Sequence, residues 1–392
     1  DFMHENDPLI FTFFLIFSGA ALLATLALYA RQALLVAYIL LGVLLGPSFA
    51  NLVNDPALIS EIAVVGIMFL LFLMGLELNP RELLRLFRKT ILVTILSSLV
   101  FAGVGISVAI AFGFTGREAL IIGAATTFSS TIIGLKLLPT TVLHHQRTGE
   151  IIISILLLQD LLAILLLIVL EGRGAVEHPL VEVLKLLVAV PLLAVAATLI
   201  VRYLLNRLLQ AFDTIREYVF LVAVGWCLGV AEAAAALGVS HEIGAFIAGV
   251  SLATSPISLY VAEALRPLRD FFLIMFFFSL GAGFDLTMLG KILVPALILA
   301  SLMLAIKPVV FRLLLQRSGE SPDRSREVGM RLGQMSEFSL LVAVMAFERG
   351  EMSKQATYLL ELATLLTFMV STYLVVLRYP TPIALSDRLR RD

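Results

Sequence analysis

The strongest constraint in the sequence is an apolar run at residues 151–170, interrupted only by Ser154 and by the pair Gln159-Asp160. As a helix rising 1.5 Å per residue, such a run spans about 30 Å, the thickness of the hydrocarbon core of a bilayer. Asp160 falls at its midpoint. A carboxylate at that depth costs about 2.5–3.5 kcal/mol on insertion scales, so we expect Asp160 to face a polar cavity and to have a function.

The composition indicates an integral membrane protein. The chain is 60% hydrophobic and 15% charged, whereas a soluble domain has about 25% charged residues. The formal net charge of -1 gives no reason to expect a nucleic-acid partner. The single cysteine, Cys227, excludes an internal disulfide and a cysteine-based zinc site. No nucleotide-binding loop, nucleophile elbow or transition-metal motif is found, so we expect no enzyme activity and no bound cofactor or metal.

Hydropathy windows, broken at Pro, Gly and clusters of charge, predict thirteen apolar helical segments. The first segment has no basic region before it and leads into further spans, so we expect no cleavable signal peptide. The predicted segments are 9–28, 33–46, 58–76, 90–113, 118–138, 149–170, 180–204, 217–237, 242–254, 268–284, 290–314, 326–347 and 355–377.

The basic residues predict the orientation. About three quarters of the 28 Lys and Arg residues lie in alternate connections between the segments, together with the C-terminal tail. Because Lys and Arg accumulate on the cytoplasmic side of membrane proteins, these connections are expected to be cytoplasmic. An odd number of spans then places the N-terminus outside and the C-terminus in the cytoplasm.

An internal repeat is visible at an offset of 207 residues. The triplet Ile-Met-Phe at 67–69 recurs at 274–276, Gly42-Val43 recurs at 249–250, and Ser129 corresponds to Ser336. The offset shifts the chain by seven segments, an odd number, so the two halves would face opposite sides of the membrane. Inverted repeats are typical of secondary transporters, whose site lies near the midplane where the halves meet.

Three segments carry polar groups at their centres: the sixth has Gln159-Asp160, the fifth has five hydroxyls within 126–131, and the twelfth has Glu337 amid Ser and Gln. Small and hydroxyl residues permit local unwinding, which frees carbonyl oxygens for a cation. The alternative is that the hydroxyls only hydrogen-bond packed helices together. The predicted ion- and proton-binding residues are Asp160, Gln159, Thr126, Thr127, Ser129, Ser130, Ser336 and Glu337.

Lys307 is the one basic residue well inside a predicted span. A buried ammonium needs a counter-charge, and we expect Asp160 or Glu337 to provide it. The alternative is that Lys307 snorkels toward the basic connection that follows. Other acids near span ends, among them Glu361, are expected to be interfacial, and the pairs at 42 and 46 and at 225 and 229 place glycines for close helix packing.

Six stretches carry a family resemblance and run across nearly the whole chain in order. They are YILLGVLLGP at 38–47, FLLFLMGLE at 69–77, SST at 129–131, LQD at 158–160, SHEIGAFIAG at 240–249 and GQMSEF at 333–338. The chain resembles the membrane domain of the cation:proton antiporter-2 family, in particular its Kef-type potassium/proton antiporter branch.

The resemblance implies an all-α polytopic membrane protein with thirteen transmembrane helices in the inverted-repeat fold of sodium/proton antiporters. Residues 1–392 would form a single membrane transport domain. Its scaffold and dimer helices one to three and eight to ten would come from 9–113 and 217–314. Its core helices four to six and eleven to thirteen would come from 90–170 and 290–377, with the fifth and twelfth unwound and crossed.

The resemblance also implies that Asp160 is the cation- and proton-binding carboxylate and that Lys307 is the lysine of the eleventh helix. It implies a homodimer, in a bacterial inner membrane. Kef-type proteins continue into a cytoplasmic nucleotide-binding regulatory domain. This sequence stops at Asp392 and has no such soluble domain, so we expect it to be truncated or to lack that control.

One carboxylate that holds either H⁺ or a monovalent cation would be neutralised by either, which favours movement of the site across the bilayer. Because Gln159 stands where sodium-type relatives have a second acid, we expect an electroneutral 1:1 exchange by alternating access. A single carboxylate with neutral oxygens is a low-field site, which favours K⁺ over Na⁺. The alternatives are a Na⁺/H⁺ antiporter and a carrier of organic anions or solutes on the same fold; a channel and an intramembrane enzyme fit less well.

Overall fold

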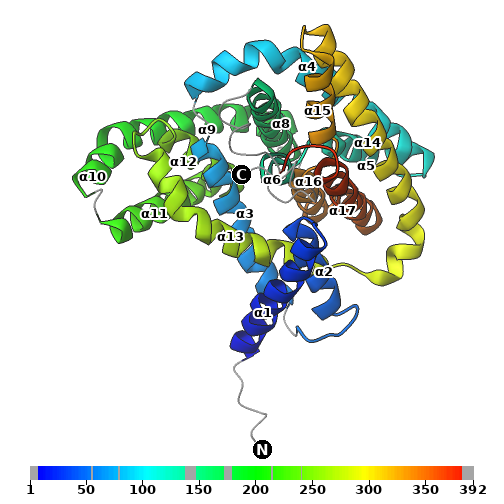
Figure 1. Cartoon of the computed structure of the whole chain (residues 1–392). Helices are drawn as coiled ribbons and strands as arrows, with labels where there is room; N and C mark the ends of the chain where they lie inside the picture. Colours follow the sequence, from blue (N-terminus) through cyan, green and yellow to red (C-terminus); the bar gives the residue numbers. More distant parts are fainter. Residues whose placement is uncertain are drawn as a thin grey trace, which may run out of the picture. The chain divides into compact units, whose positions relative to one another are not determined.

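The structure is a computed structural model, and it describes residues 8–53, 56–77, 80–136, 147–171, 179–212, 215–239 and 241–381. Its elements are helices, and each of the thirteen predicted segments contains one or two of them (Figure 1). In chain order they are α1 (Pro8–Tyr29), α2 (Leu34–Leu45), α3 (Pro56–Glu77), α4 (Pro80–Ala111), α5 (Gly116–Thr126), α6 (Thr131–Lys136), α8 (Arg147–Glu171), α9 (Pro179–Ile200), η1 (Val201–Leu205), α10 (Asn206–Ala211), α11 (Arg216–Ala236), α12 (His241–Leu252), α13 (Ser258–Ala282), η2 (Leu286–Met288), α14 (Leu289–Arg317), α15 (Pro322–Arg331), α16 (Glu337–Glu348) and α17 (Lys354–Val376).

Six of the described helical stretches are long and apolar enough to cross a membrane. Large apolar side chains stand exposed along them, for example Leu22, Leu99 and Leu221, each at least 65% exposed. Such side chains are expected on a surface that faces lipid. The six stretches are Ile10–Tyr29, Thr90–Ala111, Val188–Ala211, Arg216–Ala236, Leu286–Arg317 and Lys354–Val376.

Two predicted segments begin late because charge hid the start of the helix. The tenth was predicted from residue 268, yet α13 starts at Ser258, with Pro267 inside it. Arg266 and Arg269 lower the hydropathy of that stretch without breaking the helix. Likewise α4 starts at Pro80, ten residues before the predicted segment, and its first turns are rich in Arg.

The chain divides into two compact units. Unit 1 comprises 1–20, 38–83 and 167–283, and unit 2 comprises 21–37, 84–166 and 284–392. In unit 1, α3 packs against α12 and α13, and α11 packs against α9 and α12. A buried apolar cluster that includes Phe72, Cys227 and Leu265 fills the space between these helices.

Two glycine-based helix crossings hold unit 1 together. A Cβ added at Gly42 of α2 or at Gly281 of α13 would collide with the backbone of the other helix. The same is true of Gly75 of α3 and Gly249 of α12. These crossings confirm the predicted role of the first glycine pair. No described atom of the chain lies within 4 Å of a Cβ built at 225 or 229 of α11, so the second pair makes no close helix contact within the described chain.

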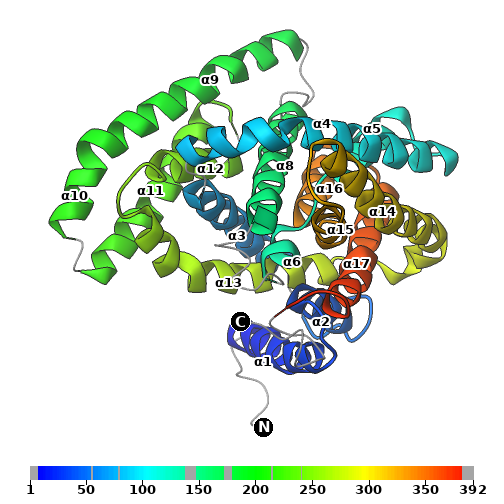
Figure 2. The ribbon, with the colours of Figure 1, turned by 45° about the horizontal axis from the view of Figure 1, so that its top comes forward.

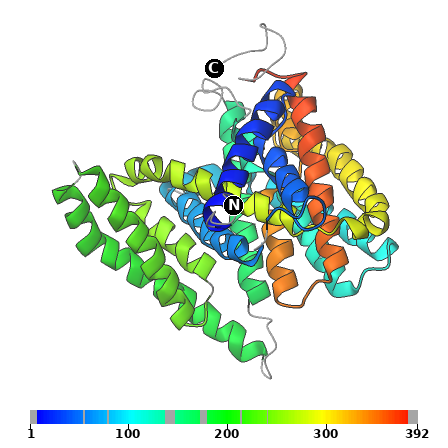
Figure 3. The ribbon, with the colours of Figure 1, turned by 90° about the horizontal axis from the view of Figure 1, so that it is seen from below.

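Unit 2 contains the two interrupted helices. α14 packs against α15 and α17, and α16 packs against α17 and α5 (Figure 2). In Figure 3 α16, in orange, runs beside α17, in red. α15 approaches α14 closely, because a Cβ at Gly329 would lie 2.5 Å from the Pro308 carbonyl oxygen. This contact fixes the part of α14 that carries Lys307.

The helices repeat at the offset predicted from the sequence. α2 and α12 have 12 residues each, and both of their ends differ by 207 in residue number. α8 and α17 begin at Arg147 and Lys354, which differ by the same 207. The two glycine crossings share this offset at one position each, since Gly42 corresponds to Gly249, whereas Gly75 and Gly281 differ by 206. The repeat is therefore a property of the backbone as well as of the sequence.

Candidate functional site

Unit 2 contains two short breaks in helical structure at the predicted polar clusters. The first interruption, residues 127–130, separates α5 from α6. The second interruption, residues 332–336, separates α15 from α16. A break in a helix leaves backbone N–H and C=O groups without intrahelical partners, and buried groups of this kind must be satisfied by side chains.

The first interruption is held by Gln159 of α8, whose side chain is fully buried. Its amide oxygen accepts a hydrogen bond from the Ser129 N–H at 2.9 Å, and its amide nitrogen donates to the Thr127 carbonyl at 3.1 Å. Both ends of the amide are therefore committed to the unwound backbone. A carboxylate at this position could accept from Ser129 but could not donate to Thr127.

The second interruption is held by α17. The Thr367 hydroxyl accepts from the Met335 N–H at 3.0 Å, and the Ser371 hydroxyl donates to the Gln334 amide oxygen at 3.0 Å. The two interruptions also contact each other, because the Ser129 hydroxyl donates to the Leu332 carbonyl at 2.9 Å. Hydroxyl and amide groups thus join both breaks into one buried polar network.

Lys307 of α14 is fully buried and reaches both interruptions. Its ammonium donates to the carbonyls of Phe128 at 2.6 Å and Gln334 at 3.0 Å, and to the Ser129 hydroxyl at 3.2 Å. Its nitrogen also lies 5.1 Å from the centre of the Phe101 ring. These oxygen partners are neutral, so the ammonium is not snorkelling away, and its predicted pairing with an acid stays a prediction.

The charges match the helix ends. Phe128 and Gln334 follow the C-termini of α5 and α15, where unpaired carbonyls carry partial negative charge, and Lys307 binds both. Glu337 is the first residue of α16, at its positive end, and its carboxylate accepts a hydrogen bond from the Thr131 hydroxyl at the start of α6. The Lys307 ammonium thus compensates the partial negative charge at two helix C-termini. The Glu337 carboxylate lies at the partially positive N-termini of two other helices.

Several predicted ligands cap helices. The Ser130 hydroxyl accepts from the Ile133 N–H in the first turn of α6, and the Ser336 hydroxyl accepts from the Phe338 N–H in α16. Thr126 and Thr127 donate their hydroxyls to carbonyls three residues back in α5. These bonds complete helix ends, and they leave hydroxyl lone pairs that could still face a cation.

The profile of the transmembrane sodium/hydrogen exchanger family matches residues 14–377. The chain belongs to the sodium/hydrogen exchanger family. The resemblance found in the sequence is thereby confirmed at the level of the family, and with the long apolar helices it makes the chain an integral membrane protein.

Two curated relatives of this sodium/hydrogen exchanger chain are named for potassium. The chain is 28% identical over 369 residues to K(+) efflux antiporter 6 from Arabidopsis thaliana, covering 92% of this chain and 62% of that protein. It is 31% identical over 353 residues to a protein from Alkalimonas amylolytica provisionally named K(+) efflux antiporter KefB, covering 87% and 52%. The chain therefore spans between half and two thirds of the length of these relatives.

A solved structure shares the fold. The sodium proton antiporter MjNhaP1 from Methanocaldococcus jannaschii at pH 8 matches with a TM-score of 0.71 over 94% of this chain and 95% of that one. The sequences are 16% identical, so the match establishes the fold alone.

The side chain of Asp160 lies outside the described part of the structure. Its backbone belongs to α8, next to Gln159. The structure brings Gln159, Ser129 and Lys307 together at the interruptions. It also places Glu337 beside Thr131. The role of Asp160 in this exchanger-family site remains a prediction.

Sequence reasoning missed the polar face of α17. Thr364, Thr367 and Ser371 are all buried, and their spacing of three and four residues places them on one helix face. That spacing was the available signal. Glu361 on the same helix was expected to be interfacial, but its side chain is only 4% exposed. Glu361 is thus packed inside the protein, on a helix that contacts α14, α15 and α16, and its depth in the membrane stays a prediction.

Proposed function

We propose that this exchanger-family chain is a secondary transporter, not an enzyme, that exchanges a monovalent cation for H⁺. The observation that carries the proposal is the buried network in which Lys307 and Glu337 match the ends of two interrupted helices. Broken helices with exposed ends are how transporters build ion sites within a membrane. The network is contiguous with α8, which carries Asp160 one residue after Gln159.

Asp160 is the proposed carboxylate that binds either the cation or H⁺. Gln159 supports this role by fixing the unwound backbone beside it, so that neutral oxygens of the first interruption stay in place. The predicted ligands Thr126, Thr127, Ser129, Ser130 and Ser336 would supply further hydroxyl or carbonyl oxygens. Glu337 would act chiefly at the helix ends.

Lys307 provides a physical argument for a low-field cation site. Its ammonium is surrounded by three neutral oxygens at 2.6–3.2 Å. A site of neutral oxygens with one carboxylate favours the more weakly hydrated K⁺ over Na⁺. The potassium names of the two curated relatives support the same preference. An organic-anion carrier is less favoured, because the ammonium that would bind the anion is already committed to protein oxygens.

The proposed mechanism is elevator-type alternating access with thirteen membrane segments, in which the two interrupted helices cross near the midplane. Unit 2 would be the moving core and unit 1 the scaffold, with a homodimer formed through unit 1. The residues of the network all fall within unit 2, which supports the division. The N-terminus would lie outside and the C-terminus in the cytoplasm of a bacterial inner membrane.

The test is H⁺ flux in proteoliposomes, followed with a pH-sensitive dye as K⁺, Na⁺, Rb⁺ or Li⁺ is added. We expect K⁺ and Rb⁺ to drive the larger dye signal, and imposed membrane potentials to leave the rate unchanged. Asp160→Asn should abolish the signal while the protein stays folded, whereas Asp270→Asn, which removes an exposed acid of α13, should not.

Three outcomes would contradict parts of the proposal. Exchange retained in Asp160→Asn would refute the site. A larger signal with Na⁺ or Li⁺ than with K⁺ would refute the ion preference, and a rate that follows the membrane potential would refute the electroneutral stoichiometry.

A further inference from the structure

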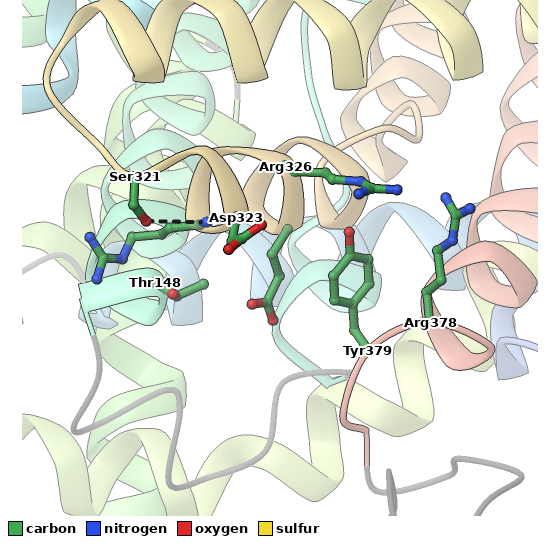
Figure 4. A pocket seen from close by; sticks show the side chains of 8 residues that line it. Thr148, Ser321, Asp323, Arg326, Arg378 and Tyr379 are labelled. Atoms are coloured by element: carbon green, nitrogen blue, oxygen red, sulfur yellow. Dashed lines mark hydrogen bonds between the residues drawn. The ribbon is translucent and has the colours of Figure 1, made fainter.

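A polar pocket in unit 2 lies apart from the buried network. Its volume is about 460 Å³, and its lining includes Thr148 of α8, Asp323 and Arg326 of α15, and Arg378 and Tyr379 just after α17 (Figure 4). The apolar stretch of α17 ends at Val376, two residues before Arg378. The pocket therefore opens where membrane-spanning helices end.

Cations predominate among the charges that remain available in the pocket. Two of its lining residues are engaged elsewhere: Arg324 binds Glu320 at 2.8 Å, and Glu327 binds Arg331 at 2.9 Å. Arg326 and Arg378 make no ion pair within the described ranges. Their guanidinium groups point toward each other across the pocket in Figure 4. Against these two cations stands one carboxylate, that of Asp323.

Tyr379 adds a neutral donor. Burial raises the pKa of its phenol, even though the nearby Arg326 guanidinium favours the ionised form. The phenol is thus protonated near neutral pH and can donate a hydrogen bond. In Figure 4 the hydroxyl points toward the α15 side of the pocket, where Arg326 lies.

We propose that this pocket binds a phosphate group through Arg326, Arg378 and the Tyr379 hydroxyl. Planar guanidinium groups hold phosphate oxygens in pairs, and two that converge from α15 and from the turn after α17 fix the group between them. The volume admits the phosphate together with the group that it esterifies. The position where spans end allows two sources, an anionic phospholipid headgroup or a soluble phosphate.

The pocket is connected to the second interruption. Glu327, which lines the pocket, accepts a hydrogen bond from Arg331, and Arg331 donates another to the Pro380 carbonyl at 2.9 Å. Arg331 is 1% exposed and immediately precedes residues 332–336. A ligand that draws α15 and the segment after α17 together would therefore act on a residue adjoining the network around Lys307.

The test is binding, so it does not depend on the proposed exchange. The full chain is purified in detergent, titrated calorimetrically with inorganic phosphate, and examined by native mass spectrometry for retained phosphatidylglycerol against phosphatidylcholine. We expect the double variant Arg326→Gln/Arg378→Gln to weaken phosphate binding, or to reduce retention of phosphatidylglycerol, at least tenfold. Arg317→Gln removes an exposed arginine outside the pocket, and this variant should bind phosphate and retain phosphatidylglycerol as the parent does.

The two arms separate the sources. Retention of phosphatidylglycerol without binding of inorganic phosphate assigns a lipid headgroup, and the converse assigns a soluble phosphate. Arg326→Lys keeps the charge but loses the paired donors. Its phosphate affinity or its retention of phosphatidylglycerol should fall between those of the parent and the double variant. If the parent, the control and the double variant behave alike in both arms, the proposal is overturned.

Discussion

The two interruptions share a backbone pattern, and the side chains that hold them differ. Apart from Lys307, which binds both, the first is held by one residue, because Gln159 on α8 satisfies both a donor and an acceptor of the unwound segment. The second is held by separate hydroxyls of α17, each making a single bond to Met335 or to the Gln334 side chain. At the repeat offset of 207, Asp160 corresponds to Thr367. Both breaks thus recur in the repeat, while the acid of α8 has a neutral hydroxyl residue as its counterpart in α17.

Lys307 joins both interruptions, so its loss should have the largest effect. Lys307→Ala leaves two buried carbonyls without a donor, which we expect to lower the unfolding free energy by about 3 kcal/mol. The measurement is denaturant unfolding in detergent. Lys291→Ala, an exposed residue of the same helix, is the control. Equal stability of the two variants would show that the ammonium does not hold the breaks together.

Gln159→Leu removes both hydrogen bonds from the Gln159 side chain to the first interruption. We expect it to lower the unfolding free energy by about 2 kcal/mol. Gln159→Glu should cost less at acidic pH than at alkaline pH, since only the protonated acid can donate to the Thr127 carbonyl. Unfolding of both variants across a pH series checks this. Identical pH dependence for the parent and Gln159→Glu would contradict the assignment of the amide donor.

Thr367→Val and Ser371→Ala each remove one hydrogen bond at the second interruption. Each should lower the unfolding free energy by about 1 kcal/mol or less. The comparison predicts that either loss is smaller than that of Gln159→Leu. Hydrogen exchange of backbone amides should show which segment loosens, with residues 332–336 affected and 127–130 protected. Loosening of both segments alike would mean that the two breaks share one support.

The smallest effects are expected where α8 and α17 begin. Arg147 lies 2.6 Å from Glu320, and Lys354, at the equivalent position, lies 4.0 Å from Asp285. Arg147→Gln should lower the unfolding free energy only slightly, and Lys354→Gln less again, because exposed ion pairs contribute little. Unfolding at low and high salt distinguishes a charge effect from a packing effect.

The Glu320 pair also predicts a dependence on pH. Burial would raise the pKa of Glu320, but hydrogen bonds from Arg147 and Arg324 hold it below the usual 4.5. A carboxyl with a lowered folded pKa contributes stability above its ordinary pKa and loses it as the pH falls through the folded value. The difference between the parent and Glu320→Gln should therefore vanish in acid. A stability difference between the parent and Glu320→Gln that grows on acidification would contradict the lowered pKa of Glu320.

The sequence was sufficient for the placement of the polar clusters and the repeat. Clusters of hydroxyl and other polar residues, such as the five hydroxyls within 126–131, identified both breaks because few apolar helices contain them. Hydropathy located the long described helices but missed the short α10 and η2 and misjudged the starts of α4 and α13, since charged first turns look like loops. Neither feature needs knowledge of how helices pack.

The division of roles among side chains could not be read from the sequence. Gln159 was predicted to bind the ion, yet both ends of its amide bind backbone. Which oxygen a hydroxyl or amide finds depends on neighbours hundreds of residues away, as with Ser129 and Leu332. The hydroxyls of α17 were overlooked because they are dispersed among apolar residues, and Glu361 because distance along the chain does not measure burial.

The glycine crossings of unit 1 limit how this chain can vary. At Gly42, Gly75, Gly249 and Gly281 one backbone rests on another, so no side chain is available there to exchange for a larger or smaller one. Natural variation in turnover or in ion preference must therefore arise at other positions. These four sites should stay glycine in any functional library of random substitutions, even though none of them touches the network around Lys307.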